Sequence, residues 1–164
     1  MKGFLWRWLV TTEPVKRLVV ATDFSDTAER ALGVAIRFAK LMGAALDLVH
    51  VYPLPSTGVV SPMPGVVPAP LPGPDELETI ERRLAALGAK AREAGVQYLS
   101  TTLVGDPPDE INSYARQVVA DLIVVGTHGR TGIRRALLGS VAEQVVRRAS
   151  GPVLVVPGRS PDSD

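Results

Sequence analysis

The sequence contains no cysteine among its 164 residues. Disulfide bonds, thiolate nucleophiles and cysteine-ligated metal sites are therefore excluded, and a cytoplasmic location fits this composition. The 18 lysine and arginine residues are balanced by 17 acidic residues, so the chain has no large net charge. Nothing in the overall charge attracts nucleic acid, which we exclude as a partner, and any anion-binding site must be local.

Long hydrophobic runs are also absent. Residues 4–10 carry both tryptophans, Trp6 and Trp8, but Arg7 interrupts this stretch, and it is far shorter than the roughly 20 residues that cross a membrane. No small-residue cleavage pattern follows it, which argues against a signal peptide. We expect no membrane span, and residues 1–15 to form an extension that is either loosely attached or an anchor for a partner or lipid surface.

The sequence has few residues suited to catalysis. Its two histidines are His50 and His128, and no set of nucleophile, base and orienting group accompanies them. Neither the P-loop pattern G-x-x-x-x-G-K-[ST] nor a G-x-G-x-x-G turn after the first apolar run occurs. The sequence therefore disfavours a GTPase and a conventional dehydrogenase.

What the sequence does contain is an alternation of two patterns. Short runs rich in β-branched and other apolar residues predict strands buried on both faces, at residues 17–22, 45–52, 96–104, 121–127 and 152–157. Apolar residues at helical spacing follow the first four runs, at residues 23–43, 77–95, 106–120 and 140–149. This alternation predicts an α/β fold with right-handed crossovers and a mostly parallel sheet that helices cover on both faces.

Local signals place several helix ends. The first helix has Ser25 or Asp26 as its N-cap and Gly43 as the left-handed residue that ends it. In the third helix, Asp106 is suited to the cap, and Pro107 to the first helical position, where its missing N–H costs nothing.

A proline-rich segment interrupts the pattern. Residues 53–74 hold eight of the 14 prolines, so this segment cannot continue a hydrogen-bonded ladder and is expected to be a loop with polyproline character. Two interpretations stay open, a solvated variable loop and a lid or partner-docking segment. We expect an extension at residues 1–15, one domain at 16–157 that contains this loop, and a tail at 158–164.

Polar and glycine-containing stretches follow three of the predicted strands. They are "ATD" at residues 21–23, "HVY" at 50–52 and "GTHG" at 126–129. Ligands bind parallel sheets outside the carboxyl ends of the strands, which is where these stretches meet. Glycines that adopt positive φ, followed by Gly139, Ser140 and a helix N-terminus, would form a cradle for an anion. The alternative is that Ser140 and Glu143 form a capping box that needs no ligand.

The glycine spacing carries a resemblance. Gly126, Gly129, Gly139 and Ser140 match the pattern G-2x-G-9x-G-(S/T) of ATP-binding members of the universal stress protein family. The segments "ATDFSDTAERAL", "LVHVY", "VGDPPDEI", "VVGTHGRTG" and "LLGSVAEQVVRRASGPVLVV" also resemble that family in order, over about residues 16–156. The resemblance implies a Rossmann-like α/β fold with an open, five-stranded parallel sheet of order 3-2-1-4-5 and helices on both faces.

The resemblance also implies a nucleotide site. Asp23 and Ala21 correspond to the adenosine side, and Val51 to the residue whose backbone recognises adenine. The loop along ribose and phosphates, and then the phosphate end, correspond to the remaining positions: Val125, Gly126, Gly129, Arg130, Gly139, Ser140 and Val141. For Asp23 alone, a cap for the first helix is the alternative.

The implied cofactor is ATP, or ADP or AMP, with Mg²⁺ bound through the phosphates because no carboxylate cluster specifies a metal site. Arg130, Arg134 and Arg135 either neutralise the phosphates or are solvated. Glu143 would repel an anion that is not screened. No catalytic residue is assigned.

The resulting function is a nucleotide-responsive stress or regulatory module. Two alternatives remain, a slow ATPase or phosphotransferase and an adaptor with a vestigial pocket. The resemblance further implies a homodimer joined through the last strand, Val153–Val156, although Pro152 and Pro157 beside it also suit the protected edge of a monomer.

Overall fold

The computed structural model describes residues 14–54, 71–127 and 138–158. Strands and helices alternate in it as the sequence predicts. In chain order they are β1 (Arg17–Ala21), α1 (Asp26–Met42), β2 (Ala45–Pro53), α2 (Pro74–Glu93), β3 (Tyr98–Gly105), α3 (Pro107–Gln117), β4 (Leu122–Gly126), α4 (Ser140–Arg148) and β5 (Val153–Val156).

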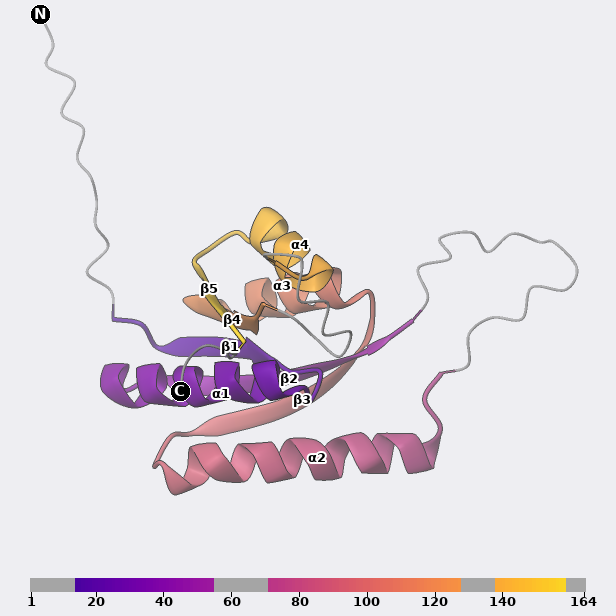
Figure 1. The fold of residues 1–164 in the computed structure, drawn as a ribbon. Coiled ribbons are helices and arrows are strands. Elements are labelled where there is room, and N and C mark those ends of the chain that lie inside the picture. The colour runs from indigo at the N-terminus through magenta and orange to yellow at the C-terminus, as the bar shows by residue number, and fades with distance from the viewer. Residues whose placement is uncertain (1–13, 55–70, 128–137, 159–164) are drawn as a thin grey trace, which may run out of the picture.

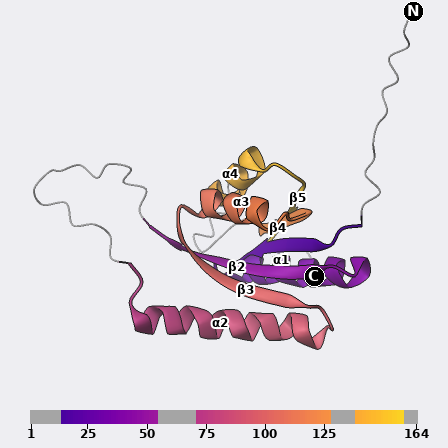
Figure 2. The ribbon, with the colours of Figure 1, turned by 180° about the vertical axis from the view of Figure 1, so that it is seen from behind.

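The five strands form one parallel sheet in the order β3-β2-β1-β4-β5. Helices α1 and α2 cover one face and α3 and α4 cover the other, as opposite views of the ribbon show (Figure 1; Figure 2). The predicted fold class and strand order are confirmed. Since each crossover helix returns the chain to the amino end of the sheet, every strand ends at the same edge.

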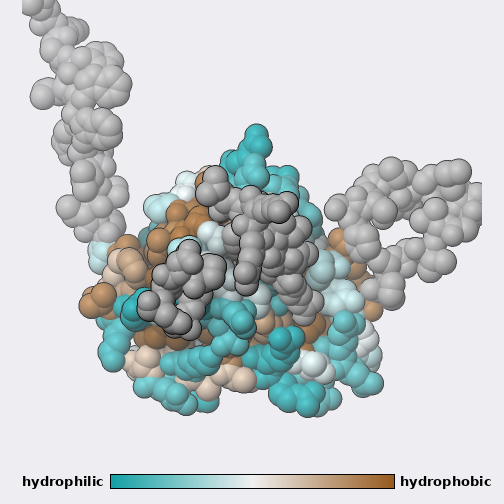
Figure 3. Space-filling model, in the orientation of Figure 1, coloured by the Kyte–Doolittle hydropathy of each residue, from teal (hydrophilic) through white to brown (hydrophobic). Residues whose placement is uncertain are grey.

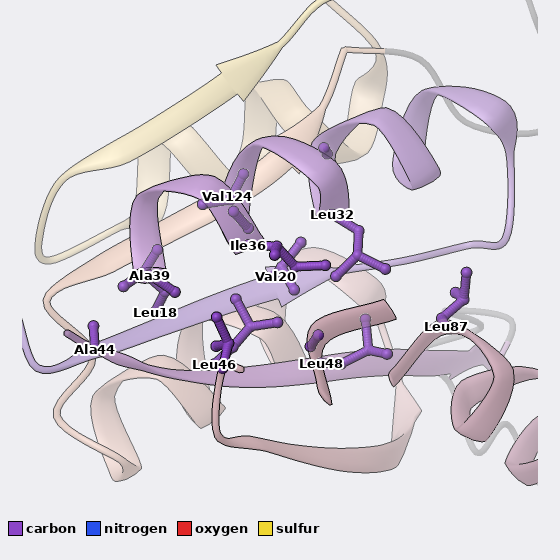
Figure 4. Close-up of a cluster of buried hydrophobic side chains, with 14 of the residues drawn as sticks. Leu18, Val20, Leu32, Ile36, Ala39, Ala44, Leu46, Leu48, Leu87 and Val124 are labelled. Carbon is purple, nitrogen blue, oxygen red and sulfur yellow. The ribbon is translucent and has the colours of Figure 1, made fainter. Parts of the chain in front are cut away.

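Each face of the sheet has its own hydrophobic core. Leu18 and Val20 point to the α1 and α2 side, where they pack with Leu32 and Leu48 (Figure 4). Val19, between them in sequence, points to the α3 and α4 side. Alternate residues of one strand thus enter different cores, which explains why the strand sequences are continuously apolar.

The outer surfaces of α1 and α2 are largely polar by contrast. Figure 3 shows hydrophilic residues over much of the lower part of one face, where α1 and α2 lie in the matching view of Figure 1. Within the described ranges, no helix combines the length and hydrophobicity needed to cross a membrane.

The predicted helix ends are mostly present. Ser25, rather than Asp26, is the N-cap of α1, and its Oγ accepts a hydrogen bond from the Ala28 N–H at 3.2 Å. Gly43 ends α1 with φ 66° in the left-handed region. Asp106 is the N-cap residue of α3 but makes no side-chain capping bond. Pro108 at the second helical position has no N–H to donate, and the Asp106 carboxylate lies 3.8 Å from the Arg148 guanidinium.

The amino half of the sheet contains a buried polar network. Asp47 on β2 is only 3% exposed and accepts a hydrogen bond from the Tyr114 hydroxyl of α3 at 3.2 Å. The Arg17 guanidinium lies 3.6 Å from the same carboxylate. Nearby, Asp121 accepts from the backbone N–H groups of Lys16 and Arg17, at 2.7 and 2.9 Å. These groups satisfy one another without a ligand.

The connection between β2 and α2 is shorter than the expected loop 53–74. Pro53 is the last residue of β2, and Pro74 is the first residue of α2. Both are positions that proline tolerates, a strand end and the first turn of a helix. Residues 55–70, like the extension with Trp6 and Trp8 and most of the tail, lie outside the described residues.

Candidate functional site

The strands do not all end at the same level. The β1–β2 register ends with Ala21 opposite Val49, whereas β2 stays paired with β3 as far as Pro53 opposite Gly105. The backbone N–H of Ala45 and the carbonyl of Val49 bond toward the β1 side. Because bonding direction alternates along a strand, the backbone of Val51 also faces that side, beyond the end of β1.

A cavity of about 680 Å³ lies at this edge of the sheet. Its walls come from the carboxyl ends of β1, β2 and β4 and from the first turns of α3 and α4. Such a volume is typical of a small-molecule site. The cavity therefore occupies the switch point of the sheet, where the chain passes from β1 to its neighbours on opposite sides.

The structure brings together every predicted site residue that it describes. These residues all line the cavity: Ala21, Asp23, Val51, Val125, Gly126, Gly139, Ser140 and Val141. Gly129 and Arg130, as well as His128, Arg134 and Arg135, lie outside the described residues.

Asp23 is tied into the turn between β1 and α1. Its Oδ1 accepts hydrogen bonds from the Ser25 N–H at 3.1 Å and the Ser25 hydroxyl at 2.6 Å. The hypothesis that Asp23 caps α1 is wrong, because Ser25 is the cap and Asp23 orients the capping side chain. The aspartate is thus a fixed carboxylate on the cavity wall.

The first turn of α4 opens into the cavity. Its N-cap is Gly139, which makes no side-chain capping bond and donates its own N–H to the Thr127 carbonyl at 2.6 Å. Ser140 is already helical, so the predicted capping box of Ser140 and Glu143 is wrong. The N–H groups of Ser140, Val141 and Ala142 have no intrahelical acceptor. These three residues line the cavity, where the helix dipole favours an anion.

The glycines on the cavity wall were expected to adopt positive φ, but the structure gives a different reason for a glycine at position 126. Of the described glycines, those with positive φ are Gly43, Gly95 and Gly105, so Gly126 and Gly139 do not adopt that conformation. A Cβ on Gly126 would lie 2.8 Å from Thr27 Cγ2 and 3.2 Å from the Thr27 backbone. Gly126 therefore allows α1 to approach β4 closely.

Sequence reasoning missed part of the wall. Thr22, His50 and Thr127 line the cavity and stand in the polar stretches, but no role in the site was assigned to them from the sequence. Pro107 and Ile111 of α3 also line it, and their segment was interpreted from the sequence only as a helix start and as part of the resemblance. The start of α3 had a usable signal, because a helix that follows a parallel strand begins at the carboxyl edge. His50 is 6% exposed, and its Nδ1 lies 2.8 Å from the Thr22 carbonyl oxygen.

The described charges at the cavity are few. Glu143 lines it and pairs with Arg147, one turn along α4, at 3.6 Å. Within residues 14–54, 71–127 and 138–158, no group of three or more histidine or acidic side chains is arranged to hold a metal ion. A carboxylate, hydroxyls, free helix N–H groups and an apolar wall together suit a ligand with an apolar part and an anionic part.

The comparison with known proteins gives this geometry a family. The profile of the universal stress protein family matches residues 14–157. The chain belongs to the universal stress protein family. A universal stress protein of Methanocaldococcus jannaschii is 40% identical over 147 residues, which cover 86% of this chain and 81% of that protein. One from Bacillus subtilis is 33% identical over 145 residues, covering 85% and 97%.

Solved structures of universal stress proteins share the fold. A universal stress protein in complex with cAMP has 31% identity and a TM-score of 0.66, covering 88% of this chain and 98% of its own. One from Archaeoglobus fulgidus in complex with dAMP has 29% identity and a TM-score of 0.64, covering 88% and 99%. These relatives bind adenine nucleotides.

Proposed function

We propose that this universal stress protein binds an adenine nucleotide in the cavity and acts as a nucleotide-responsive regulatory module. The observation that carries the proposal is the cavity itself, which contains both an apolar wall and an open helix N-terminus. The cAMP and dAMP complexes of its relatives support the choice of adenine.

The base fits the side of the cavity formed by β2 and α3. Val49, Val51, Pro53 and Ile111 offer apolar contacts there. The backbone N–H and carbonyl of Val51 supply a donor and an acceptor, which match the Watson–Crick edge of adenine. We assign the ribose to the neighbourhood of Asp23 and Ala21, where a carboxylate accepts hydrogen bonds from sugar hydroxyls.

The phosphates fit the first turn of α4. The N–H groups of Ser140 and Val141 and the Ser140 hydroxyl would donate to phosphate oxygens. The Arg147 guanidinium beside Glu143 offsets part of the negative charge of that carboxylate. We further propose that Val125 and Gly126 border the ribose, that Gly129 and Arg130 add phosphate contacts, and that Mg²⁺ enters only with a polyphosphate.

Isothermal titration calorimetry with AMP, ADP and ATP, with and without Mg²⁺, tests the proposal. We expect saturable binding of at least one of them, and binding of GMP weaker by roughly tenfold or more, because guanine reverses the donor and acceptor at the edge that faces Val51. Release of nucleotide on denaturing the purified protein would agree. Absence of both bound nucleotide and binding heat would overturn the proposal.

ATP turnover is the second candidate activity. Among the described residues, His50 is the one imidazole at the cavity, and its Nδ1 is engaged by the Thr22 carbonyl. Phosphate release that persists through repurification and disappears in Ser140→Ala would establish turnover. A rate that falls with each purification step would assign it to a contaminant.

We also propose a homodimer through β5. This strand pairs only with β4 among the described elements, so its other edge is open to a second copy. Sedimentation of the protein and of a Val155→Pro variant, in which the lost backbone N–H faces away from β4, tests this assembly. A parent protein that sediments as a monomer would overturn it.

A further inference from the structure

The turn that carries Asp23 contains an unusual backbone conformation. Phe24 has φ 65° in the left-handed region, which residues with a side chain rarely adopt. Its N–H donates to the Thr22 Oγ1 at 3.0 Å. Since this conformation is unfavourable for phenylalanine, other contacts must maintain it.

Two side chains from other elements contact the Phe24 ring. The His50 ring of β2 lies with its centroid 4.4 Å from that of Phe24. The Arg83 guanidinium of α2 lies over the Phe24 ring, 4.0 Å from its centroid, within the range of a cation–π interaction. The three side chains form a stack, Arg83–Phe24–His50, which joins α2, the β1–α1 turn and β2.

This stack reaches the cavity at one end only. His50 lines the cavity, and its Nδ1 contacts the carbonyl of Thr22, next to Asp23. No described residue of α2 lines the cavity, and Arg83 is exposed on the outer surface. The geometry therefore connects a surface arginine to the backbone that presents the Asp23 carboxylate.

We infer that Phe24 and Arg83 are positioning residues, which hold the β1–α1 turn in its left-handed conformation so that Asp23 faces the nucleotide. The inference rests on the proposed function for its effect on binding, but the turn can also be measured without a ligand. It makes α2, outside the cavity, a determinant of nucleotide affinity.

Neighbouring arginines on α2 provide a matched test. Arg83 stacks on Phe24, whereas Arg82 contacts Thr79 on its own helix at 3.3 Å. We expect Arg83→Gln to weaken AMP binding about threefold and Arg82→Gln to leave it unchanged. Phe24→Ala should weaken it about tenfold, and Phe24→Tyr, which keeps the ring, should restore most of the affinity.

Amide hydrogen exchange in the protein without nucleotide separates the inference from the proposed function. The Ser25 N–H, which donates to Asp23, and the Phe24 N–H report on the turn. In Arg83→Gln and Phe24→Ala, the exchange of these two N–H groups should become faster, by about the same factor as the AMP affinity falls in each variant. In Arg82→Gln, their exchange should stay as it is in the parent protein. A parent protein that carries no bound nucleotide and binds none of AMP, ADP and ATP would overturn the proposed function, and these exchange rates would then decide the role of the stack.

Thermal unfolding tests the alternative that Arg83 contributes only to stability and does not position the turn. If Arg83→Gln lowers the unfolding temperature but leaves both the AMP affinity and the turn exchange unchanged, the inference is overturned. Equal behaviour of Arg82→Gln and Arg83→Gln overturns it as well. Because Arg83 is exposed, its replacement tests the stack even if Phe24→Ala does not fold.

Discussion

The two ends of the sheet use similar side chains in opposite ways. Toward the amino ends, Asp47 is buried and its polar partners, Tyr114 and Arg17, come from the chain itself. At the carboxyl ends, Asp23 and the first turn of α4 border a cavity. The same residue type is therefore buried among partners at one end and lines a cavity at the other, because ligand sites of parallel sheets lie at the carboxyl ends of the strands.

The largest expected effects come from replacing the aspartate at each end of the sheet. Asp47→Ala leaves the Tyr114 hydroxyl without its carboxylate acceptor, and we expect the free energy of unfolding to fall by about 2–3 kcal/mol. Urea denaturation measures this loss. Nucleotide affinity of the folded protein should not change, since Asp47 does not line the cavity. A loss below about 0.5 kcal/mol would contradict the structural role of the network.

Asp23→Asn is the matched change at the carboxyl end. It keeps an oxygen for Ser25 but removes the charge, so stability should change by less than about 0.5 kcal/mol while AMP binding weakens by about tenfold. Calorimetry at constant pH measures the affinity. Unchanged binding would remove Asp23 from the proposed site.

A substitution at Gly126 tests whether this glycine is needed for the close packing of α1 against β4. In Gly126→Ala, the new methyl group would overlap Thr27, and we expect a loss of about 1–3 kcal/mol in the free energy of unfolding. Adding Thr27→Ala should recover part of it, because the nearest contact is Thr27 Cγ2. No recovery in the double variant would mean that the strain lies in the backbone contact.

The helix N-termini at the carboxyl edge give a finer comparison. Ser25 caps α1 through its side chain, whereas Ser140 lies inside the first turn of α4. Ser25→Ala should lower the free energy of unfolding by about 1 kcal/mol. Ser140→Ala should leave stability unchanged and weaken binding of phosphate-bearing nucleotides, with adenosine binding unaffected. Equal stability losses at both serines would contradict the difference in capping.

The smallest expected effect is a pH dependence at the amino end. Burial raises the pKa of Tyr114 above the ordinary value of 10.0, and the Asp47 charge adds to this direction. As the pH rises, the Tyr114 hydroxyl therefore loses its proton in the unfolded chain before it does so in the folded protein. The contribution of Tyr114 to the free energy of unfolding is fully present below pH 10 and is lost as the pH rises through the folded pKa. Unfolding in urea should depend less steeply on pH above 10 in Tyr114→Phe. Equal slopes would contradict the raised pKa.

Much of the fold was predictable because its signals are local. The apolar runs, Gly43 and the alternation of strands with helices lead directly to the parallel sheet. The site residues were chosen by resemblance, and the structure gathers the described ones around one cavity. The roles of individual residues were less predictable: Gly126 is explained by Thr27, a contact across the fold that no spacing reveals.

The error at Ser140 has a similar cause. The pattern S-x-x-E fits a capping box in sequence, but the helix begins at Ser140 itself, with Gly139 as its cap. A shift of one residue at a helix end is invisible to periodicity, yet it changes the serine from a cap into a group on the cavity wall. The left-handed conformation of Phe24 likewise has no signal in the sequence, and the side chains that contact its ring come from β2 and α2.

The offset between β1 and β2 determines how recognition of a base has to be studied. Val51 would recognise the base through its backbone N–H and carbonyl, which every amino acid except proline carries in the same form. Changing its side chain would alter packing and leave those hydrogen bonds in place. The informative variable is then the chemistry of the ligand: inosine monophosphate, in which an oxo group replaces the exocyclic amine, exchanges a donor for an acceptor while the protein stays constant.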